Sequence, residues 1–586
     1  MPHVFRRYSQ PLSIVATALL LSLLGACGKQ PENTTTTVNA ATTPAWSVFL
    51  DQYIEDYFKA HPTFAASQGR HEYDGKMPDW SAAGIANEIA RLHRQRILAS
   101  AYTNERLTER ERFERDYLLA QIDRDLFWQE NAALPFRNPE FYFDSIDSID
   151  PAMYVSRPYA SLEKRAQAFI VYANAIPKAA QQIRANLRLP MPATFVQFGV
   201  AGFGGLADFY RKDVSQVFAT VNDAQVQQQL KTAIESAANA MQGLADWLKS
   251  NEKDATQDFA MGPKLFADML WMTERVNTPL DRLEAIGRAD LDRNLAALKD
   301  ACKQYAPHAT IQKCAEEMNA DKEKGGAVEG ARAQLAGLKQ FIIDHKVVSI
   351  PGDEQVQVDQ APSYNAQNFA YIIIPGPYDQ GLPSVYYIAP PDKAWSKAEQ
   401  DAYLPGKADL LFTSVHEVWP GHFLQFLHSN RSSFRFGQLF VGYAFAEGWA
   451  HYSEEMMWES GLGNGDPETH IGQLQEALLR DVRFLCAIGL HTKGMTVAES
   501  EKMFREQGMQ DAGNARQQAA RGTRDPAYLN YTMGKLMIRK LRVDWTAKHG
   551  GSDAWREFHD SFLSYGGPPI PLVRAQMLPE QSEALF

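Results

Sequence analysis

The sequence lacks the clustered positive charge that nucleic-acid binding requires. Its 59 lysine and arginine residues are outnumbered by 70 aspartate and glutamate residues, which gives a formal net charge of −11. Affinity for nucleic acid depends on clustered basic side chains that displace counterions, so we expect no nucleic-acid partner. Hydrophobic residues make up 45% of the chain and aromatic residues 11%. This composition excludes a disordered protein and indicates a large folded body.

Several catalytic motifs are also missing. No Gly-x-Ser-x-Gly elbow lies beside a predicted strand, so the sequence does not support a serine hydrolase. The chain has neither a Walker loop nor a Gly-x-Gly-x-x-Gly turn between a strand and a helix, so those modes of nucleotide binding are not expected. Beyond the N-terminus, no apolar run is long enough to cross a bilayer.

The N-terminus has the pattern of a lipoprotein export signal. Two arginines precede an apolar run over residues 11–24, which is too short for a spanning helix and is typical of a signal peptide. The run ends in Leu-Gly-Ala-Cys27, which resembles the bacterial lipobox at which a cysteine is lipidated. We predict a signal peptide over residues 1–26, then a lipidated cysteine and a flexible polar tether over residues 27–45. The alternative is an ordinary secretory signal with an incidental cysteine.

The residue after Cys27 bears on the location of the protein. Gly28 stands where enterobacterial lipoproteins retained at the inner membrane typically carry aspartate. By resemblance to those lipoproteins, we expect a lipid-anchored protein of the cell envelope, at the periplasmic face or the cell surface. The outer membrane is favoured.

The rest of the chain has a dominantly helical pattern. Apolar residues recur at three- and four-residue steps over residues 226–248, as on one face of a helix. Two runs of β-branched and aromatic residues, 370–374 and 384–388, are bounded by proline and glycine and predict two short strands. We therefore expect a mainly α fold with a small sheet. We divide it into a helical region over residues 46–350 and a catalytic region over residues 351–586.

Only three cysteines follow Cys27. Cys302 and Cys314 are close in sequence, and an exported chain enters a compartment that permits disulfides. Pairing cannot be derived from sequence alone, so a bridge and two buried thiols remain alternatives. Cys486 lies in an apolar stretch and is expected in the core.

A metal-binding motif is indicated at residues 416–422, which read His-Glu-Val-Trp-Pro-Gly-His. In the zincin pattern His-Glu-x-x-His, two histidines one helical turn apart face one metal ion. Here Pro420 stands at the place of the second histidine, and an unbroken helix would turn His422 roughly 120° away from His416. Proline and glycine disrupt helices, so a bulged turn at Pro420-Gly421 could bring the histidines together. The alternative is a chance His-Glu pair at the end of a helix.

A second acidic motif follows at residues 447–455, which read Glu-Gly-Trp-Ala-His-Tyr-Ser-Glu-Glu. Thermolysin-type enzymes take their third zinc ligand, a glutamate, from a second helix. Glu447 fits this role. Glu417, beside the first histidine, fits the general base that accepts a proton from water as the water attacks a polarised carbonyl.

The pair His-Glu-x-x-Pro-Gly-His and Glu-Gly-Trp-Ala-x-Tyr-x-Glu, with Gly-Arg-His at 69–71, resembles a bacterial family catalogued as a domain of unknown function. That family is similar to the gluzincin metallopeptidases, the group of thermolysin, angiotensin-converting enzyme and the thermostable carboxypeptidases. The resemblance covers most of the mature chain. It implies a large helical zincin-like fold with a deep cleft, one zinc ion and peptide hydrolysis. It assigns His416, His422 and Glu447 as the zinc ligands. The two predicted strands lie just upstream of the metal motif, so we expect the small sheet near the metal site.

Two neighbours of Glu447 have further expected roles. His451 lies one turn away on the same helical face and is an alternative ligand. Glu454, two turns away, is better suited to orienting a ligand histidine, and His451 is otherwise expected to serve in the same supporting shell.

The resemblance also implies roles for C-terminal residues. His491, eight residues after Arg483, and Tyr531 would donate hydrogen bonds to the developing oxyanion, with Tyr528 in reserve. Relatives often carry an acid at the position of Ala487, so no local carboxylate is expected to orient His491. The alternative for each residue is a buried structural network.

Two further groups of residues would bind the substrate. Arg521 or Arg524 would hold a substrate carboxylate in a bidentate contact. Tyr386 and Tyr387, on the second predicted strand, would flank the cleft if that strand offers an edge to an extended peptide. The alternative for the strand is a core position with aromatic filling.

Together these features predict zinc-dependent hydrolysis of short peptides by an exported lipoprotein. A closed cleft, implied by the resemblance, favours short peptides over folded proteins. One alternative is another metal-dependent amidase or esterase, since the same groups would cleave any activated carbonyl. Another is a non-enzymatic lipoprotein that binds a peptide or an envelope partner. Apart from its lipid anchor, no membrane contact is expected, and the oligomeric state does not follow from the sequence.

Overall fold

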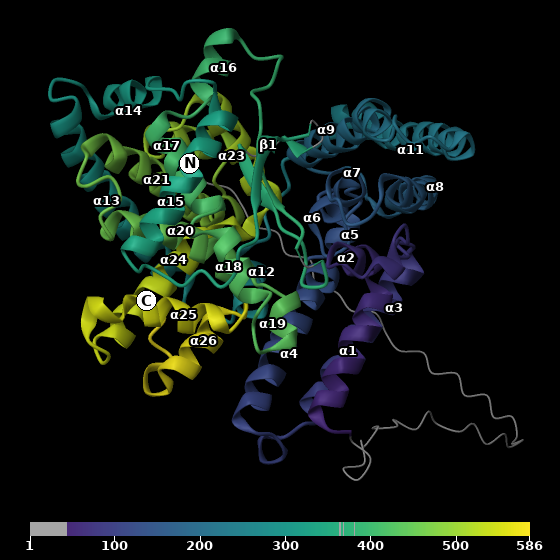
Figure 1. Ribbon diagram of the computed structural model, residues 1–586, viewed down its shortest axis with the longest axis horizontal. Helices are drawn as coiled ribbons and strands as arrows, with labels where there is room; N and C mark the ends of the chain where they lie inside the picture. Colours follow the sequence, from purple (N-terminus) through teal and green to yellow (C-terminus); the bar gives the residue numbers. More distant parts are fainter. Residues whose placement is uncertain (1–43, 363–364, 367–368, 380) are drawn as a thin grey trace, which may run out of the picture. The chain divides into compact units, whose positions relative to one another are not determined.

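The computed structural model describes residues 44–586 except for three short gaps, at residues 363–364, 367–368 and 380. The predicted signal peptide, Cys27 and nearly all of the predicted tether lie outside the described residues. The described chain is mainly helical with one small sheet, which confirms the predicted fold class (Figure 1). None of its helices combines the length and the apolar character that a membrane span needs. The predicted boundary between a helical and a catalytic region stays a prediction.

The first four helices share a hydrophobic cluster, and they are α1 (Trp46–Ala60), α2 (Pro62–Ser67), α3 (Ala82–Ser100) and α4 (Glu109–Leu126). The short helices α5 (Leu134–Arg137), α6 (Phe141–Asp144) and α7 (Ala152–Ser156) follow, and their apolar residues pack in the main core instead. Tyr57, Leu92 and Tyr117 represent α1, α3 and α4 in the cluster. Phe436 and Phe440, in and just after α19 (Arg435–Leu439), complete it. The N-terminal helices are thereby joined to a segment more than 300 residues further along the chain.

A second group of helices follows. It consists of α8 (Leu162–Asn186), α9 (Ala193–Phe209), α10 (Ser215–Val217) and α11 (Ala224–Ser250). α11 packs against both α8 and α9, and the three lie together at one side of Figure 1. The apolar face predicted from the sequence is buried, with Val226, Leu230 and Ile234 in the core. This confirms the predicted helix.

Close helix packing builds the C-terminal half. The helices are α12 (Pro263–Glu274), α13 (Leu280–Tyr305), α14 (Ile311–Ala320), α15 (Ala327–Asp344), α16 (Lys397–Tyr403), α17 (Lys407–Glu417), α18 (His422–Ser429), α20 (Tyr443–Glu459), α21 (Pro467–Thr492), α22 (Val497–Glu506), α23 (Ala512–Arg524), α24 (Asn530–Thr546), α25 (Trp555–Ser564) and α26 (Ile570–Met577). α13 packs along α21, and α20 packs along α24. At the α20–α24 crossing, a Cβ on Gly534 would lie 2.2 Å from the carbonyl oxygen of Ala444 and 2.6 Å from Cα of Gly448. The two backbones can approach this closely only because Gly448 and Gly534 have no side chains.

The sheet has three short strands, β1 (Val356–Gln360), β2 (Ala370–Ile373) and β3 (Ser384–Ile388). β3 is the central strand, parallel to β1 and antiparallel to β2. The two predicted strands are present, and β2 contacts α17. However, β3 has hydrogen-bonded neighbours on both sides, so the prediction that it offers an edge to a peptide is wrong. Tyr386 is fully buried and Tyr387 is 8% exposed, which places both in the core instead of along a substrate cleft.

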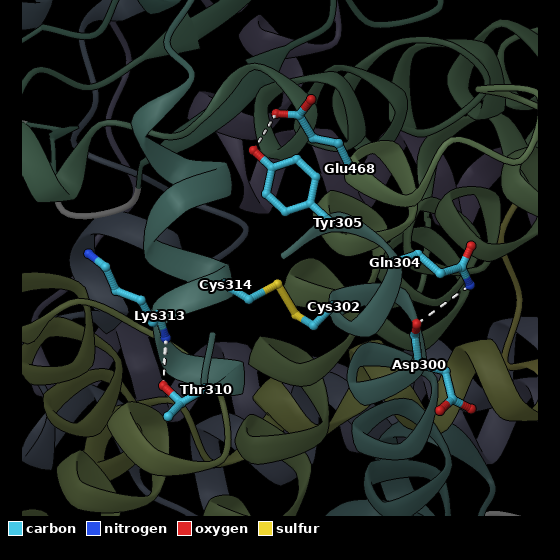
Figure 2. Close-up of a disulfide and its surroundings, with 8 residues drawn as sticks. All are labelled: Asp300, Cys302, Gln304, Tyr305, Thr310, Lys313, Cys314 and Glu468. Atoms are coloured by element: carbon cyan, nitrogen blue, oxygen red, sulfur yellow. Dashed lines mark hydrogen bonds between the residues drawn. A yellow bond between two sulfur atoms is a disulfide. The ribbon is translucent and has the colours of Figure 1, made fainter. Parts of the chain in front are cut away.

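A disulfide joins Cys302 in α13 to Cys314 in α14 (Figure 2). The structure therefore has the bridge and not the two thiols that the sequence left open. Just after α14, Asp321 accepts a hydrogen bond through its carbonyl oxygen from the amide of Lys407, at 2.7 Å, where α17 begins. The bridge thus ties α13 to the segment that supports the start of α17. Cys486 is buried, as predicted.

Candidate metal centre

The predicted metal motif spans a break between two helices. α17 ends at Glu417 and α18 begins at His422. The amide of Gly421 donates to the carbonyl oxygen of Val415 at 2.9 Å, a six-residue step that is wider than the four-residue step of an α-helix. This wide turn brings the rings of His416 and His422 to a centroid distance of 4.9 Å. The chain leaves the helical path where the sequence predicts a bulge.

Gly421 is required by a close approach of two backbone segments. A Cβ at this position would lie 1.7 Å from the carbonyl oxygen of His416, so no side chain fits without moving the turn. The turn is also attached to α20, because the indole nitrogen of Trp449 donates to the carbonyl oxygen of Pro420 at 2.8 Å. Both contacts position His422 relative to α20.

Glu447 of α20 completes a triad with the two histidines. Its Oε2 lies 3.3 Å from Nε2 of His416 and 3.2 Å from Nε2 of His422. One ligand atom from each of the three residues lies within 4.8 Å of the other two. Burial raises the pKa of Glu447, but the two histidines outweigh this effect and hold the pKa well below its usual value. Glu447 therefore offers a carboxylate oxygen.

This set of donor atoms fits a zinc ion. Two imidazole nitrogens and one carboxylate oxygen are the protein ligands of many catalytic zinc sites, which leave a further position open. A ligand histidine typically bonds through its other ring nitrogen to a carboxylate. Here Nδ1 of His416 lies 2.6 Å from Oε1 of Glu454, so Nε2 is left for the metal. Glu454 thus occupies the supporting position that the sequence predicts for it.

His451 lies beside the triad but not in it. Its Nδ1 lies 3.0 Å from Oε2 of Glu454, and its Nε2 has no hydrogen-bond partner in the described chain. Burial, with a smaller effect of Lys535, lowers the pKa of His451 to about 4, so the ring is neutral at pH 7. The geometry favours the supporting role of His451 over the alternative in which it is a ligand.

Arg480 is a residue of this site that the sequence analysis missed. Its Nη2 lies 3.3 Å from Oε1 of Glu454 and 3.2 Å from Nδ1 of His416. Burial raises the pKa of Glu454, but Arg480 and the neighbouring histidines outweigh it and hold the pKa well below its usual value. The sequence places Glu476 one helical turn before Arg480, and the two form an ion pair, but this spacing does not indicate the contact with Glu454 on another helix.

Glu417 is placed to act as a base beside the triad. Its side chain is buried, and its Oε2 has no hydrogen-bond partner among the described residues. Burial raises the pKa of Glu417, although His422 and His416 oppose the shift. A carboxylate with a free oxygen and a raised pKa suits proton transfer near neutral pH.

Tyr531, in the first turn of α24, lies against the triad. Its ring stacks on the ring of His416, at a centroid distance of 6.0 Å. Nη2 of Arg521 lies 2.9 Å from the hydroxyl oxygen of Tyr443 and 3.4 Å from that of Tyr531. Arg521 is also paired with Asp525 at 3.0 Å. Its guanidinium therefore positions two tyrosines and has a carboxylate partner already.

A cavity of about 990 Å³ lies next to the triad. Glu447, Tyr443 and Arg521 contribute to its wall where it meets the triad. The N-terminal helices and the segments near them supply much of the remaining wall, including Tyr57, His61, Trp80, Glu88, Arg91, Arg124, Asp125 and Asp147. This hollow corresponds to the predicted cleft, but the sequence analysis did not foresee that residues 57–150 would line it.

Two of the predicted site residues lie in the core instead. Nε2 of His491 lies 2.7 Å from the carbonyl oxygen of Gly522, and burial lowers the pKa of His491 to about 4. His491 follows Arg480 by eleven residues on α21, which is about 16 Å further along the helix. It therefore lies away from the triad, which Arg480 contacts. Tyr528 is fully buried, with its hydroxyl packed against Gly522. The structure thus corrects the predictions that His491 or Tyr528 meets the developing oxyanion.

Two more arginines lie near the cavity and the triad. Arg524 lines the cavity but forms an ion pair with Glu140, so, like Arg521, it is not a free carboxylate clamp. Arg483, on α21, has its Cζ 4.7 Å from the ring centroid of Tyr531. Burial, reinforced by Arg521, lowers the pKa of Arg483.

The fold and the triad define a mainly helical protein with a candidate two-histidine, one-glutamate metal centre. The chain belongs to the bacterial protein family of unknown function DUF885, whose family model matches residues 62–577. Comparison with curated proteins finds no match.

Two solved structures are similar to this one. A proposed lipoprotein of unknown function from Shewanella oneidensis is 22% identical, with a TM-score of 0.73 over 91% of this chain and 100% of that chain. A proposed lipoprotein from Colwellia psychrerythraea is 17% identical, with a TM-score of 0.76 over 92% of this chain and 100% of that chain. At this level of identity, the likeness establishes the shared fold.

Proposed function

We propose that the protein is a zinc-dependent hydrolase that cleaves peptide bonds in short peptides. The observation that carries the proposal is the convergence of His416, His422 and Glu447 beside the buried Glu417. A binding protein needs no base next to the ligand atoms, whereas a hydrolase does. We also propose a relation to the gluzincin peptidases, which the same set supports: two histidines from a His-Glu motif and a glutamate from a later helix.

Each neighbouring residue has a defined task in this proposal. A zinc ion, when bound, supplies a Lewis acid that polarises a carbonyl group and acidifies water. The carboxylate of Glu417 accepts the proton from water and passes it to the leaving amine. The hydroxyl of Tyr531 donates to the oxygen on which negative charge develops, and Arg521 orients this hydroxyl. Glu454 accepts from Nδ1 of His416 and so holds its ring, and Arg480 forms an ion pair with Glu454.

The proposed substrate class follows from the size of the cavity. A volume of about 990 Å³ accommodates a peptide of a few residues and excludes a folded protein. The location follows from the lipobox-like sequence at Cys27, and the two similar structures described as proposed lipoproteins support it. We propose an anchor in the cell envelope, with the outer membrane favoured by Gly28.

The test combines metal analysis with peptide cleavage, using the purified mature protein and its Glu417→Gln and His422→Ala variants. We expect about one zinc ion per chain in the wild type and in Glu417→Gln, and a loss of zinc in His422→Ala. Cleavage of a mixed peptide set should fall on the order of 10²–10⁴-fold in Glu417→Gln, because only the base is removed.

The matched control is Glu455→Gln. Glu455 is also a buried carboxylate of α20, but it pairs with Arg293 and not with the triad. Cleavage of esters or acylated amines with no cleavage of peptides would replace the proposal by another hydrolase. Peptide binding without any cleavage, in a zinc-loaded wild type, would replace it by a binding protein.

A further inference from the structure

The arginines near Tyr531 and in the cavity wall differ in how their charges are balanced. Three of them have carboxylate partners: Arg480 with Glu454 and Glu476, Arg521 with Asp525, and Arg524 with Glu140. Arg483 is the exception, because no carboxylate of the described chain lies within ion-pairing distance of it. Its Nε donates to the neutral side chain of Gln518 at 2.8 Å.

Arg483 is nevertheless deeply buried, with 6% of its surface exposed. Its Nη1 and Nη2 have no hydrogen-bond partner among the described residues. Unlike Nε of Arg480, which is sealed from solvent and has no partner, these two nitrogen atoms keep some solvent access. The outer edge of the guanidinium can therefore be reached from outside the packed chain. A buried cation without a counter-charge is unfavourable, so this edge suits an anion that arrives from outside the chain.

The position of Arg483 connects this edge to the triad. The ring centroid of Tyr531 lies 4.7 Å from Cζ of Arg483 and 6.0 Å from the ring centroid of His416. These two separations place the guanidinium within about 11 Å of the ring of His416. Consecutive Cα atoms are about 3.8 Å apart, so a peptide C-terminus one or two residues beyond a carbonyl at the triad brings its carboxylate about 4–8 Å toward the guanidinium. Arginine binds carboxylates with two parallel hydrogen bonds, which matches the free Nη1 and Nη2.

We propose that Arg483 binds the C-terminal carboxylate of the peptide substrate, so that the enzyme removes one or two residues from a free C-terminus. This inference rests on the proposed function. It assigns the carboxylate contact to Arg483 in place of Arg521 and Arg524, whose charges are already balanced.

The test compares peptides that differ only in the terminal group, a free acid and its amide. In the wild type, kcat/KM should be at least tenfold higher for the acid. In Arg483→Gln the acid-to-amide ratio of kcat/KM should fall close to one. In Arg483→Lys, which keeps the charge but loses the bidentate geometry, this ratio should lie between one and the wild-type value. Equal kcat/KM for acid and amide in the wild type would overturn the inference while leaving the proposed function intact.

The matched control is Arg288→Gln. Arg288 also donates to a glutamine, Gln507, at 3.1 Å, but it lies exposed on α13. The acid-to-amide ratio should be unchanged in this variant. An equal fall in Arg288→Gln and Arg483→Gln would show an indirect effect and overturn the inference.

A binding measurement separates this inference from catalysis. Calorimetric titration of the zinc-loaded Glu417→Gln variant with an acetylated dipeptide acid should give at least tenfold tighter binding than its amide. The preference should vanish when Arg483→Gln is added, even if no peptide is ever cleaved. An inorganic anion is the competing occupant. If chloride stimulates cleavage of acid and amide alike in the wild type but not in Arg483→Gln, the site belongs to that anion and the inference is overturned.

Discussion

At the scale of single residues, the candidate metal centre depends on a few side chains outside the triad. Glu454 is fully buried and contacts both His416 and His451, while Arg480 keeps it ionised. The sequence predicts this role because Glu454 lies two helical turns from Glu447. Arg480 was not predicted, because its contact with Glu454 is made between two helices.

Replacing Glu454 by glutamine should weaken metal binding by about 10–100-fold, the usual effect of losing a carboxylate behind a ligand histidine. The amide loses the negative charge that orients Nδ1 of His416. Competition with a fluorescent zinc chelator measures the change. Glu455→Gln, on the same helix but outside the site, should bind zinc as the wild type does. Equal zinc affinity in Glu454→Gln and the wild type would contradict the assigned role.

At the scale of helices, two close approaches assemble the site. The break between α17 and α18 turns His422 toward His416. The crossing of α20 and α24 brings Tyr443, one turn before Glu447, against Tyr531. Each approach depends on glycine at the contact. The first was predicted from the Pro-Gly pair, because proline and glycine disrupt a helix locally. The second was not, because nothing in the local sequence indicates which helix Gly534 meets.

Replacing Gly534 by alanine should force α20 and α24 apart. The added Cβ would meet the backbone of Ala444 at 2.2 Å, and backbone cannot rotate away. We expect a loss of about 1–3 kcal/mol in the free energy of unfolding and weaker zinc binding. Thermal unfolding and zinc titration measure the two effects.

Gly243→Ala is the control for this variant. A Cβ on Gly243, within α11, has no neighbour within 4 Å, so this change should stabilise the protein by about 0.5–1 kcal/mol. If Gly534→Ala behaved like Gly243→Ala, the close crossing would not be a constraint on the fold.

At the scale of the whole molecule, the site joins parts that are distant in sequence. The triad and Glu417 come from residues 416–447, whereas much of the cavity wall comes from residues 57–150. Arg524 reaches Glu140 across 384 residues. Zinc bound by α17, α18 and α20 should therefore stabilise the packed chain as a unit.

Zinc at about 100 times its dissociation constant should add about 2.7 kcal/mol to the free energy of unfolding, because it binds the folded state only. The expected result is a melting temperature several degrees higher with zinc than with a chelator. His422→Ala should show no such difference, because it lacks one ligand. A wild-type melting temperature that is the same with zinc and with chelator would contradict a metal site at the triad.

The sequence by itself determined the mainly helical class, two of the three strands and the residues of the candidate metal triad. These features depend on short-range patterns: the period of apolar residues, turn residues, and the spacing of histidine and glutamate. The tertiary structure decided which of the candidate residues meet. It paired Arg521 and Arg524 with carboxylates, left Arg483 without one and buried His491 and Tyr387 in the core. Those outcomes depend on how helices and strands pack against partners far away in the chain, and short-range spacing carries no record of that packing.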